Sequence, residues 1–186
     1  MDASTQHDED ISERAATSAR LLLDAFDRVR ELVPAVVEGL SPEEVSWRPD
    51  KEANSIGWLL WHLARVEDSH LAELDGSVQI WTQDGWAQRF QLPYEESDIG
   101  FAQDSAAVGQ FFVADPSLLI AYHEAVHART REIVSRLTGE DHERVIDDSY
   151  DPPVTVGARL VSVINDTTQH IGQASYVRGL VERRAQ

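Results

Sequence analysis

Residues 55–74 read SIGWLLWHLARVEDSHLAEL, and the apolar residues of this stretch return every three or four positions. This interval is the period of an α-helix with one buried face, whereas a β-strand would alternate every second residue. Asn54 or Ser55 can cap the first turn of the helix, and the pattern stops at Gly76. The buried stripe consists of Ile56, Leu59, Leu63, Val66 and Leu74. His62 lies within this stripe, so the sequence predicts a helix with one histidine on its buried face.

Three further stretches have the same helical period. Residues 11–37 form the first, which Pro34 should end or kink because a proline removes one hydrogen bond of the helix. Residues 115–137 begin with an Asp-Pro pair, a capping residue followed by a proline in the first turn. The last stretch covers residues 155–182, and no segment alternates for long enough to indicate a sheet. Four amphipathic helices predict an all-α fold, an up-and-down four-helix bundle.

The length and composition of the chain are typical of one soluble globular domain. Of its 186 residues, 42% are hydrophobic and 26% are charged. We expect a single domain over residues 11–186. Residues 1–10, MDASTQHDED, have too little apolar surface to offset the entropy lost on ordering, so a disordered tail is expected there. Because the sequence has no recognisable signal peptide or membrane span, we expect a cytoplasmic protein that does not bind a membrane.

The chain is strongly acidic and has no cysteine. Its 33 Asp and Glu against 16 Lys and Arg give a formal net charge of −17. Nucleic-acid binding depends on basic side chains that neutralise phosphates, so no nucleic-acid partner is expected. The absence of cysteine excludes a disulfide framework, a thiolate nucleophile and a cysteine-ligated metal site. Histidine and carboxylate side chains are the ligands left for a metal.

Residues 77–114 connect the second and third predicted helices and have no sustained period. Unstructured connections longer than ~12–15 residues are uncommon in a compact domain and are often functional. The segment contains the aromatic residues Trp81, Trp86, Phe90, Tyr94, Phe101, Phe111 and Phe112. We favour a binding lid over the alternative, in which these aromatic residues attach the loop to the bundle.

Asp166 and His170 lie four residues apart on the last predicted helix, so both side chains leave the same face one turn apart. That face is the apolar one, as is the face that carries His62. A buried carboxylate is costly unless it is paired or bound to a metal. Two histidines and one carboxylate are a known open ligand set for zinc and iron, so these residues are candidate metal ligands. The alternative is a hydrogen-bonded core histidine and an intrahelical ion pair.

The other histidines are weaker candidates. His123 and His127 have the same spacing, but they lie at the edge of an apolar stripe among charged residues, and we expect a solvated flank. His70 and His142 are expected at the surface. The chain has no GxSxG, GxxxxGK[ST] or GxGxxG motif, so serine-nucleophile and nucleotide chemistries have no local support.

Two stretches of the sequence together resemble a known family. They are residues 55–74 with His62, and residues 165–181, NDTTQHIGQASYVRGLV, with the pattern Asp166-x-x-x-His170-x-Gly-Gln. Both resemble the DinB-like superfamily, and within it the branch grouped with the mycothiol- and bacillithiol-dependent S-transferases, including mycothiol-dependent maleylpyruvate isomerase. The resemblance covers the first to the last predicted helix and implies a DinB-like four-helix bundle.

The resemblance implies one divalent metal ion, zinc before nickel or iron, held by His62, Asp166 and His170. The family has histidine or glutamate at the position of Asp166, so this chain carries a shorter carboxylate there. The implied reaction is a thiol transfer, in which the metal lowers the pKa of a low-molecular-weight thiol such as mycothiol and the thiolate attacks a small electrophile.

Substrate contacts are also implied by the resemblance. Trp81 and Trp86 are candidate contacts of an apolar electrophile, and Arg65 or Arg159 is a candidate partner of an acidic group on the thiol or the substrate. Two alternatives remain: a metal-dependent hydrolase with metal-bound water as nucleophile, and a non-enzymatic ligand-binding bundle. A homodimer is expected, as for many members of the family.

Overall fold

Four long helices dominate the structure. The computed structural model describes the backbone of residues 3–184 and the side chains of residues 17–184. The long helices are α1 (Ala3–Val37), α3 (Ile56–Asp75), α7 (Ser117–Arg136) and α9 (Val156–Arg184). The all-α prediction is confirmed.

Short elements fill the connections between the long helices. The short helices are α2 (Pro42–Val45), α4 (Ile80–Gln83), α5 (Trp86–Phe90), α6 (Ser105–Val108) and α8 (Gly139–Glu143). Two strands, β1 (Val145–Asp147) and β2 (Val154–Thr155), pair antiparallel before α9. None of the helices in the described part of the chain combines the length and apolar character that a membrane crossing needs.

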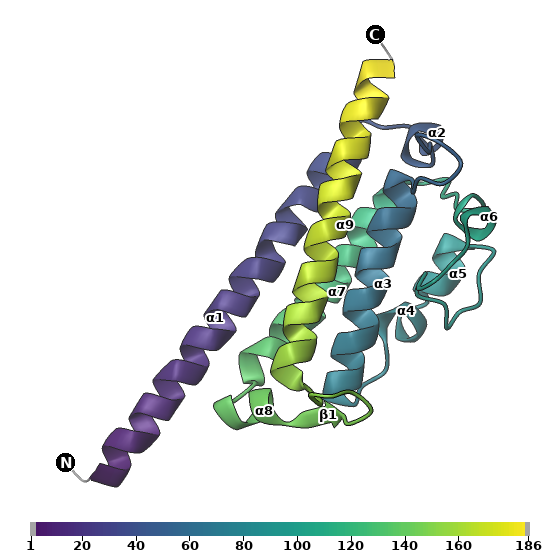
Figure 1. The fold of residues 1–186 in the computed structure, drawn as a ribbon. Coiled ribbons are helices and arrows are strands. Elements are labelled where there is room, and N and C mark those ends of the chain that lie inside the picture. The colour runs from purple at the N-terminus through teal and green to yellow at the C-terminus, as the bar shows by residue number, and fades with distance from the viewer. Residues whose placement is uncertain (1–2, 185–186) are drawn as a thin grey trace.

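The long helices do not alternate regularly in direction. Figure 1 shows α1 and α9 running one way along the bundle and α3 and α7 running the other way. The pairs α1/α3 and α7/α9 are antiparallel, as an up-and-down bundle requires. The predicted alternation fails between α3 and α7, because residues 76–116 return along the outside of the bundle. A connection of this length can span the bundle, whereas a short loop would force antiparallel neighbours.

Local capping explains where the two helices of the candidate site begin and end. At the start of α3 the Ser55 hydroxyl accepts a hydrogen bond from the Trp58 N–H at 3.2 Å, and at its end Gly76 has a φ of 68°. At the start of α9 the Thr155 hydroxyl accepts a hydrogen bond from the Ala158 N–H at 3.2 Å. The predicted starts of both helices are therefore confirmed.

The first helix is longer than predicted. It begins at Ala3, whereas the sequence predicts its start at Ile11, and it continues through Pro34 to Val37. The segment before Pro34 contains neither glycine nor proline, so no helix-breaking residue separates Ala3 from the predicted start. The helix ends where predicted, before Gly39 with a φ of 80°.

Helix α3 lies at the centre of the molecule. It packs against α7 and α9, and the connection that follows it covers another side. Most of its residues are therefore buried, including the charged Arg65, Glu67 and Asp68. The buried face of α3 is therefore wider than the single apolar stripe that the sequence predicts. The helical period of apolar residues contains no information on a loop that covers the opposite face.

The aromatic residues of the connection belong mostly to the core. Trp81 and Trp86 are buried, and their rings lie 5.2 and 5.5 Å from the ring of Tyr122 in α7. Phe111 is buried in the same cluster. The predicted lid is therefore wrong for these residues, and the alternative, attachment of the loop to the bundle, is correct. Phe101 differs, since 82% of its surface is exposed.

Candidate metal centre

Helices α3 and α9 bring the three predicted ligands together. His62 lies on α3, and Asp166 and His170 lie one turn apart on α9. One ligand atom from each residue can be chosen so that all lie within 4.8 Å of one another. The His170 Nε2 atom is 3.6 Å from Asp166 Oδ2. Zinc bonds of ~2.0–2.2 Å place tetrahedral ligand atoms about 3.3 Å apart, so the side chains need to close in only slightly around one ion.

Both histidine rings are oriented by a hydrogen bond at Nδ1. The His62 Nδ1–H donates to the carbonyl oxygen of Ile99, 2.5 Å away, because a carbonyl can only accept. His170 Nδ1 lies 3.1 Å from Gln173 Oε1 and donates to it in the same way. In the neutral form of each ring the lone pair then lies on Nε2, which is the arrangement of histidines that bind a metal. Burial acts to lower the pKa of His170, but its hydrogen bond to Asp166 and the charge of Asp166 outweigh this effect and raise the pKa, so a metal ion would replace a proton on His170 Nε2.

Asp166 supplies a carboxylate oxygen without a partner. The side chain is half-buried, and its Oδ1 atom has no hydrogen-bond partner among the described residues. Burial acts to raise the pKa of Asp166, but the hydrogen bond and charge of His170 outweigh this effect and leave the pKa lowered. An ionised carboxylate with a buried, unpaired oxygen is a group that a cation would satisfy. The three residues therefore fit a divalent ion.

The loop over His62 is tightly built. Gly100 has a φ of 88°, and a Cβ atom there would lie 2.8 Å from His62 Nδ1. The Asp98 carboxylate accepts hydrogen bonds from the Gly100 N–H and from Gln103 Nε2, both at 2.7 Å. Gln103 in turn accepts a hydrogen bond from the Trp58 indole at 2.8 Å. The glycine lets the backbone approach closely enough for the Ile99 carbonyl to reach His62.

A small hollow opens beside the triad. It has a volume of about 190 Å³, and His62 and Asp166 both contribute to its wall. Exposed Phe101 and half-buried His70 also line it. A ligand atom in this hollow would therefore lie next to two of the three candidate ligands.

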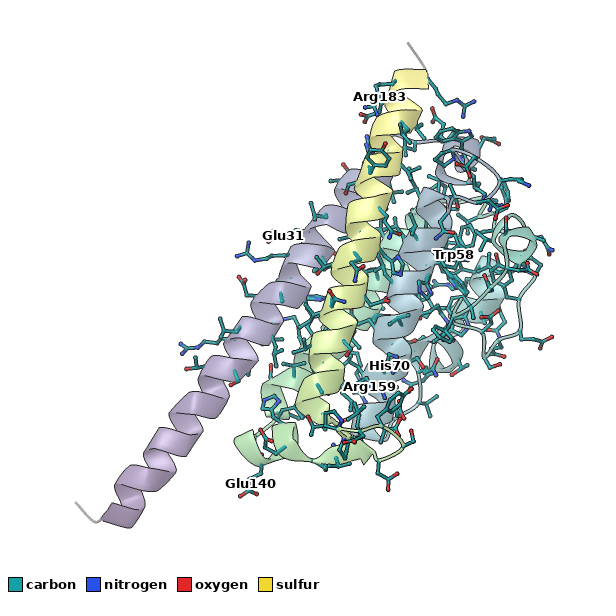
Figure 2. The ribbon with its side chains drawn as sticks, viewed as in Figure 1. Glu31, Trp58, His70, Glu140, Arg159 and Arg183 are labelled. Carbon is teal, nitrogen blue, oxygen red and sulfur yellow. The ribbon has the colours of Figure 1, made fainter. Side chains whose placement is uncertain are left out.

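The four predicted substrate contacts differ in where they lie. Arg65 is completely buried; its guanidinium donates to the carbonyl oxygens of Asp98 and Glu96, and it stacks 4.7 Å above Trp81. Arg159 donates to His70 Nδ1 at 2.8 Å, and Figure 2 shows these two side chains together near the end of α3 and the start of α9. Arg65, Trp81 and Trp86 thus lie in the core, whereas Arg159 contacts His70 in the wall of the small hollow and stays a predicted substrate contact.

His123 and His127 are buried, so the predicted solvated flank is wrong. The His123 Nε2 atom is 3.7 Å from Glu67 Oε2, and Glu67 Oε1 accepts a 2.6 Å hydrogen bond from the Thr130 hydroxyl. The His127 Nε2 atom is 2.8 Å from Asp27 Oδ1. Carboxylates on α3 and α1 thus face this side of α7, and helical periodicity alone does not reveal such partners.

The sequence assigned no orienting role to three residues that position the histidines, although Gln173 stands in the quoted Asp166-x-x-x-His170-x-Gly-Gln pattern. Gln173 follows His170 by three positions, so its spacing on the helix was a usable signal. Ile99 and Gly100 lie in an aperiodic loop, and no local pattern places them against His62.

Comparisons with known proteins identify the family of the chain. A model of the mycothiol S-transferase family matches residues 21–183. A crystal structure of a conserved protein from Enterococcus faecalis is 31% identical in sequence and superimposes with a TM-score of 0.83. The match covers 87% of this chain and 95% of that one. No curated protein matches the chain.

Proposed function

The chain belongs to the mycothiol S-transferase family, and from this membership we propose that it is a divalent-metal-dependent thiol S-transferase that joins a mycothiol-type thiol to a small electrophile. The observation that carries the proposal is the convergence of His62, Asp166 and His170 between α3 and α9. Two imidazole rings whose neutral forms carry the lone pair on Nε2 meet there with one carboxylate oxygen that has no hydrogen-bond partner among the described residues.

The chemistry of these donors favours particular metals. Two imidazole nitrogens and one carboxylate oxygen suit zinc, with iron and nickel as alternatives, and three protein ligands leave positions open for substrate. A bound divalent ion would supply Lewis acidity that lowers the pKa of a thiol and provides a nucleophilic thiolate near neutral pH. The chain needs no cysteine of its own for this reaction, because the cosubstrate brings the sulfur.

Neighbouring residues prepare the ligands. Burial lowers the pKa of His62, which keeps its imidazole neutral and able to bind a metal at neutral pH. The Trp58 ring stacks on the His62 ring at 4.7 Å and shields one of its faces from water. The Ile99 carbonyl and Gln173 favour, for the neutral rings, the tautomer that has its proton on Nδ1 and its lone pair on Nε2.

Metal content tests the first half of the proposal. The full chain, purified without a histidine tag or chelators, is expected to contain about one zinc, iron or nickel ion per chain. His62→Ala, Asp166→Asn and His170→Ala should each lose it, whereas His142→Ala, on α8, should keep it. Wild-type protein that stays metal-free when divalent ions are supplied would contradict the proposal.

Thiol dependence tests the second half. The metal-loaded protein should consume small electrophiles in the presence of mycothiol and should be inactive without a thiol. Equal turnover without thiol would instead indicate a hydrolase. A loaded protein with no turnover under either condition would indicate a ligand-binding bundle.

A further inference from the structure

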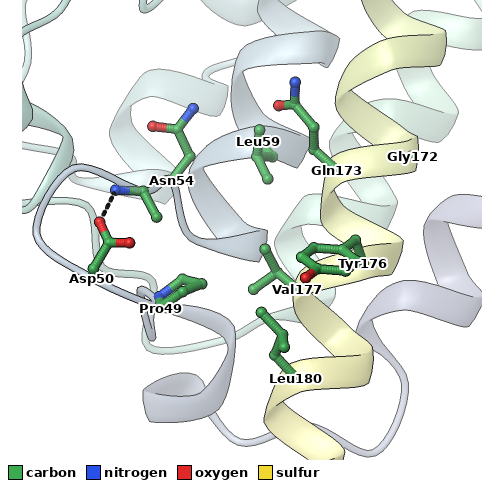
Figure 3. A pocket seen from close by; sticks show the side chains of 10 residues that line it. Pro49, Asp50, Asn54, Leu59, Gly172, Gln173, Tyr176, Val177 and Leu180 are labelled. Carbon is green, nitrogen blue, oxygen red and sulfur yellow. Dashed lines mark hydrogen bonds between the residues drawn. The ribbon is translucent and has the colours of Figure 1, made fainter.

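A second, larger hollow lies between α9 and the segment that joins α2 to α3. Its volume is about 620 Å³, and small-molecule sites typically occupy roughly 300–1,000 Å³. Leu59, Tyr176, Val177 and Leu180 form much of its wall. Figure 3 shows Gln173 at one end of this hollow and Leu180 at the other. The space is therefore large enough for a small organic molecule and is mostly apolar.

The hollow begins beside the candidate metal ligands. Gln173 lines it and is also the hydrogen-bond partner of His170 Nδ1. Leu59 lines it from α3 and precedes His62 by three residues. Because one helical turn rises about 5.4 Å, a molecule at this end would lie about one turn from the triad along each helix. Both helices that hold the triad therefore continue into the wall of the hollow.

The charges around the hollow disfavour an anion. No arginine or lysine is found among the described residues that line it. Asp50 is the charged residue in the lining, and its Oδ1 atom already accepts hydrogen bonds from the N–H groups of Glu52 and Ala53. The chain as a whole has a net charge of −17. A carboxylate bound here would lose its hydration without gaining a cationic partner.

We propose that this hollow binds the electrophile of the transferase, and that it selects a neutral, apolar electrophile over one that carries an acidic group. This inference rests on the proposed function. An apolar epoxide illustrates the reaction: the thiol sulfur bonds to an epoxide carbon, the carbon–oxygen bond opens, and the thiol proton passes to the oxygen. The product is a hydroxy thioether, and no further reactant is needed.

Binding of two inert fluorescent probes to the full, metal-loaded chain tests the inference without relying on turnover. N-phenylnaphthylamine is neutral, and anilinonaphthalenesulfonate has the same rings with one negative charge. Tyr176→Ser and Leu180→Asp alter the wall of the hollow. Val161→Ser is the matched control, because Val161 is an apolar residue of α9 outside the hollow and is 62% exposed, against 68% for Tyr176.

The neutral probe should bind the wild type at least about tenfold more tightly than the sulfonated probe, a difference of ~1.4 kcal/mol. Tyr176→Ser should weaken the neutral probe about tenfold, and Val161→Ser should leave its Kd unchanged. Equal or tighter binding of the sulfonated probe, or equal effects of Tyr176→Ser and Val161→Ser, would overturn the inference. Metal content measured on the same samples separates this result from a failure of the proposed function.

Discussion

Gly100 is the residue whose identity the site depends on most directly. Its φ of 88° and the 2.8 Å approach of a Cβ to His62 Nδ1 exclude a larger residue without displacement of the loop. Gly100→Ala is expected to break the hydrogen bond between His62 and the Ile99 carbonyl. Loss of such an orienting contact typically lowers metal affinity about 10–100-fold. Competition titration with a chromophoric chelator measures this effect.

Gly76→Ala is the matched control for backbone strain. Gly76 also has a positive φ, 68°, but a Cβ there would meet nothing within 4 Å. The control should lose about 1 kcal/mol of stability from the strain and keep its metal affinity. If both alanine variants bind metal like the wild type, the close approach of Gly100 to His62 has no role in the site.

At the residue scale, the sequence predicts three candidate ligands that the structure brings together, but not the groups that orient them. His62, Asp166 and His170 could be found because each is a polar residue on an apolar helix face, and that signal is local. The Ile99 carbonyl carries no side-chain signal, and its position depends on how the loop folds back over α3. Arg65 was misassigned for the same reason, since its partners are carbonyl oxygens of that loop.

Between α3 and α7, Glu67 and His123 form a buried pair whose protonation differs from that in the unfolded chain. Burial raises the pKa of Glu67 to about 7 and lowers the pKa of His123 to about 3. Between pH 4.5 and 7 Glu67 keeps its proton in the folded state and loses it in the unfolded state. Raising the pH through this range therefore lowers the free energy of unfolding. Between pH 3 and 6.5 His123 is protonated in the unfolded state and neutral in the folded state. Raising the pH through this range therefore increases the free energy of unfolding. The two effects oppose each other between pH 4.5 and 6.5.

Removing one partner should reveal the effect of the other. Glu67→Gln keeps an acceptor for Thr130, and its free energy of unfolding should rise with pH by up to about 1.4 kcal/mol per unit relative to the wild type between pH 4.5 and 6.5. His123→Gln should show the opposite slope. Urea denaturation at several pH values measures both, with exposed Glu132→Gln as the control. Parallel pH profiles for all four proteins would mean that burial does not shift these groups.

Arg65 joins α3 to the loop that carries Ile99 and Gly100. Its guanidinium is completely buried, donates to the carbonyl oxygens of Asp98 and Glu96, and lies 3.6 Å from Asp68. Arg65→Met should reduce the free energy of unfolding by about 3 kcal/mol, because buried polar groups lose their partner. Hydrogen exchange should become faster in residues 96–103, and metal should bind more weakly.

The comparison for this variant is Arg129→Met. Arg129 is partly exposed and pairs with Asp75 and Glu132, away from the loop. Surface ion pairs contribute only about 0–1 kcal/mol, so this variant should leave exchange in residues 96–103 unchanged. Unchanged exchange in Arg65→Met as well would show that the loop holds its position without this residue.

At the scale of elements, a feature could be predicted where it depends on residues close together in the sequence, and not where it depends on contacts between distant helices. The starts of α3 and α9 depend on hydroxyl caps within three residues, so the sequence was sufficient. The packing of Trp81 and Trp86 depends on Tyr122 in a distant helix, and an aperiodic stretch contains nothing that indicates this contact. The burial of His123 depends in the same way on Glu67 of α3.

For the whole molecule, the directions of the long helices decide which segment covers the candidate metal site. The family predicted from the sequence is confirmed by the match over residues 21–183. The parallel course of α3 and α7 was missed, because helix periodicity contains no information on direction. The returning connection is what covers α3 and places Ile99 over His62. The predicted ligands thus depend on a feature of topology that the sequence pattern does not specify.

A metal between α3 and α9 would link the central helix to the last one and should stabilise the whole fold. An ion that binds only the folded state at about 100 times its Kd adds about 2.7 kcal/mol. For a domain of this size each kcal/mol raises the Tm by about 2–4 °C, so metal should raise it by roughly 5–10 °C. Calorimetry of the metal-loaded and chelator-treated full chain measures the difference. His170→Ala should show no such difference, because it lacks one ligand and leaves Asp166 without its neighbour. A wild-type Tm that does not respond to metal would mean that no ion binds preferentially to the folded state.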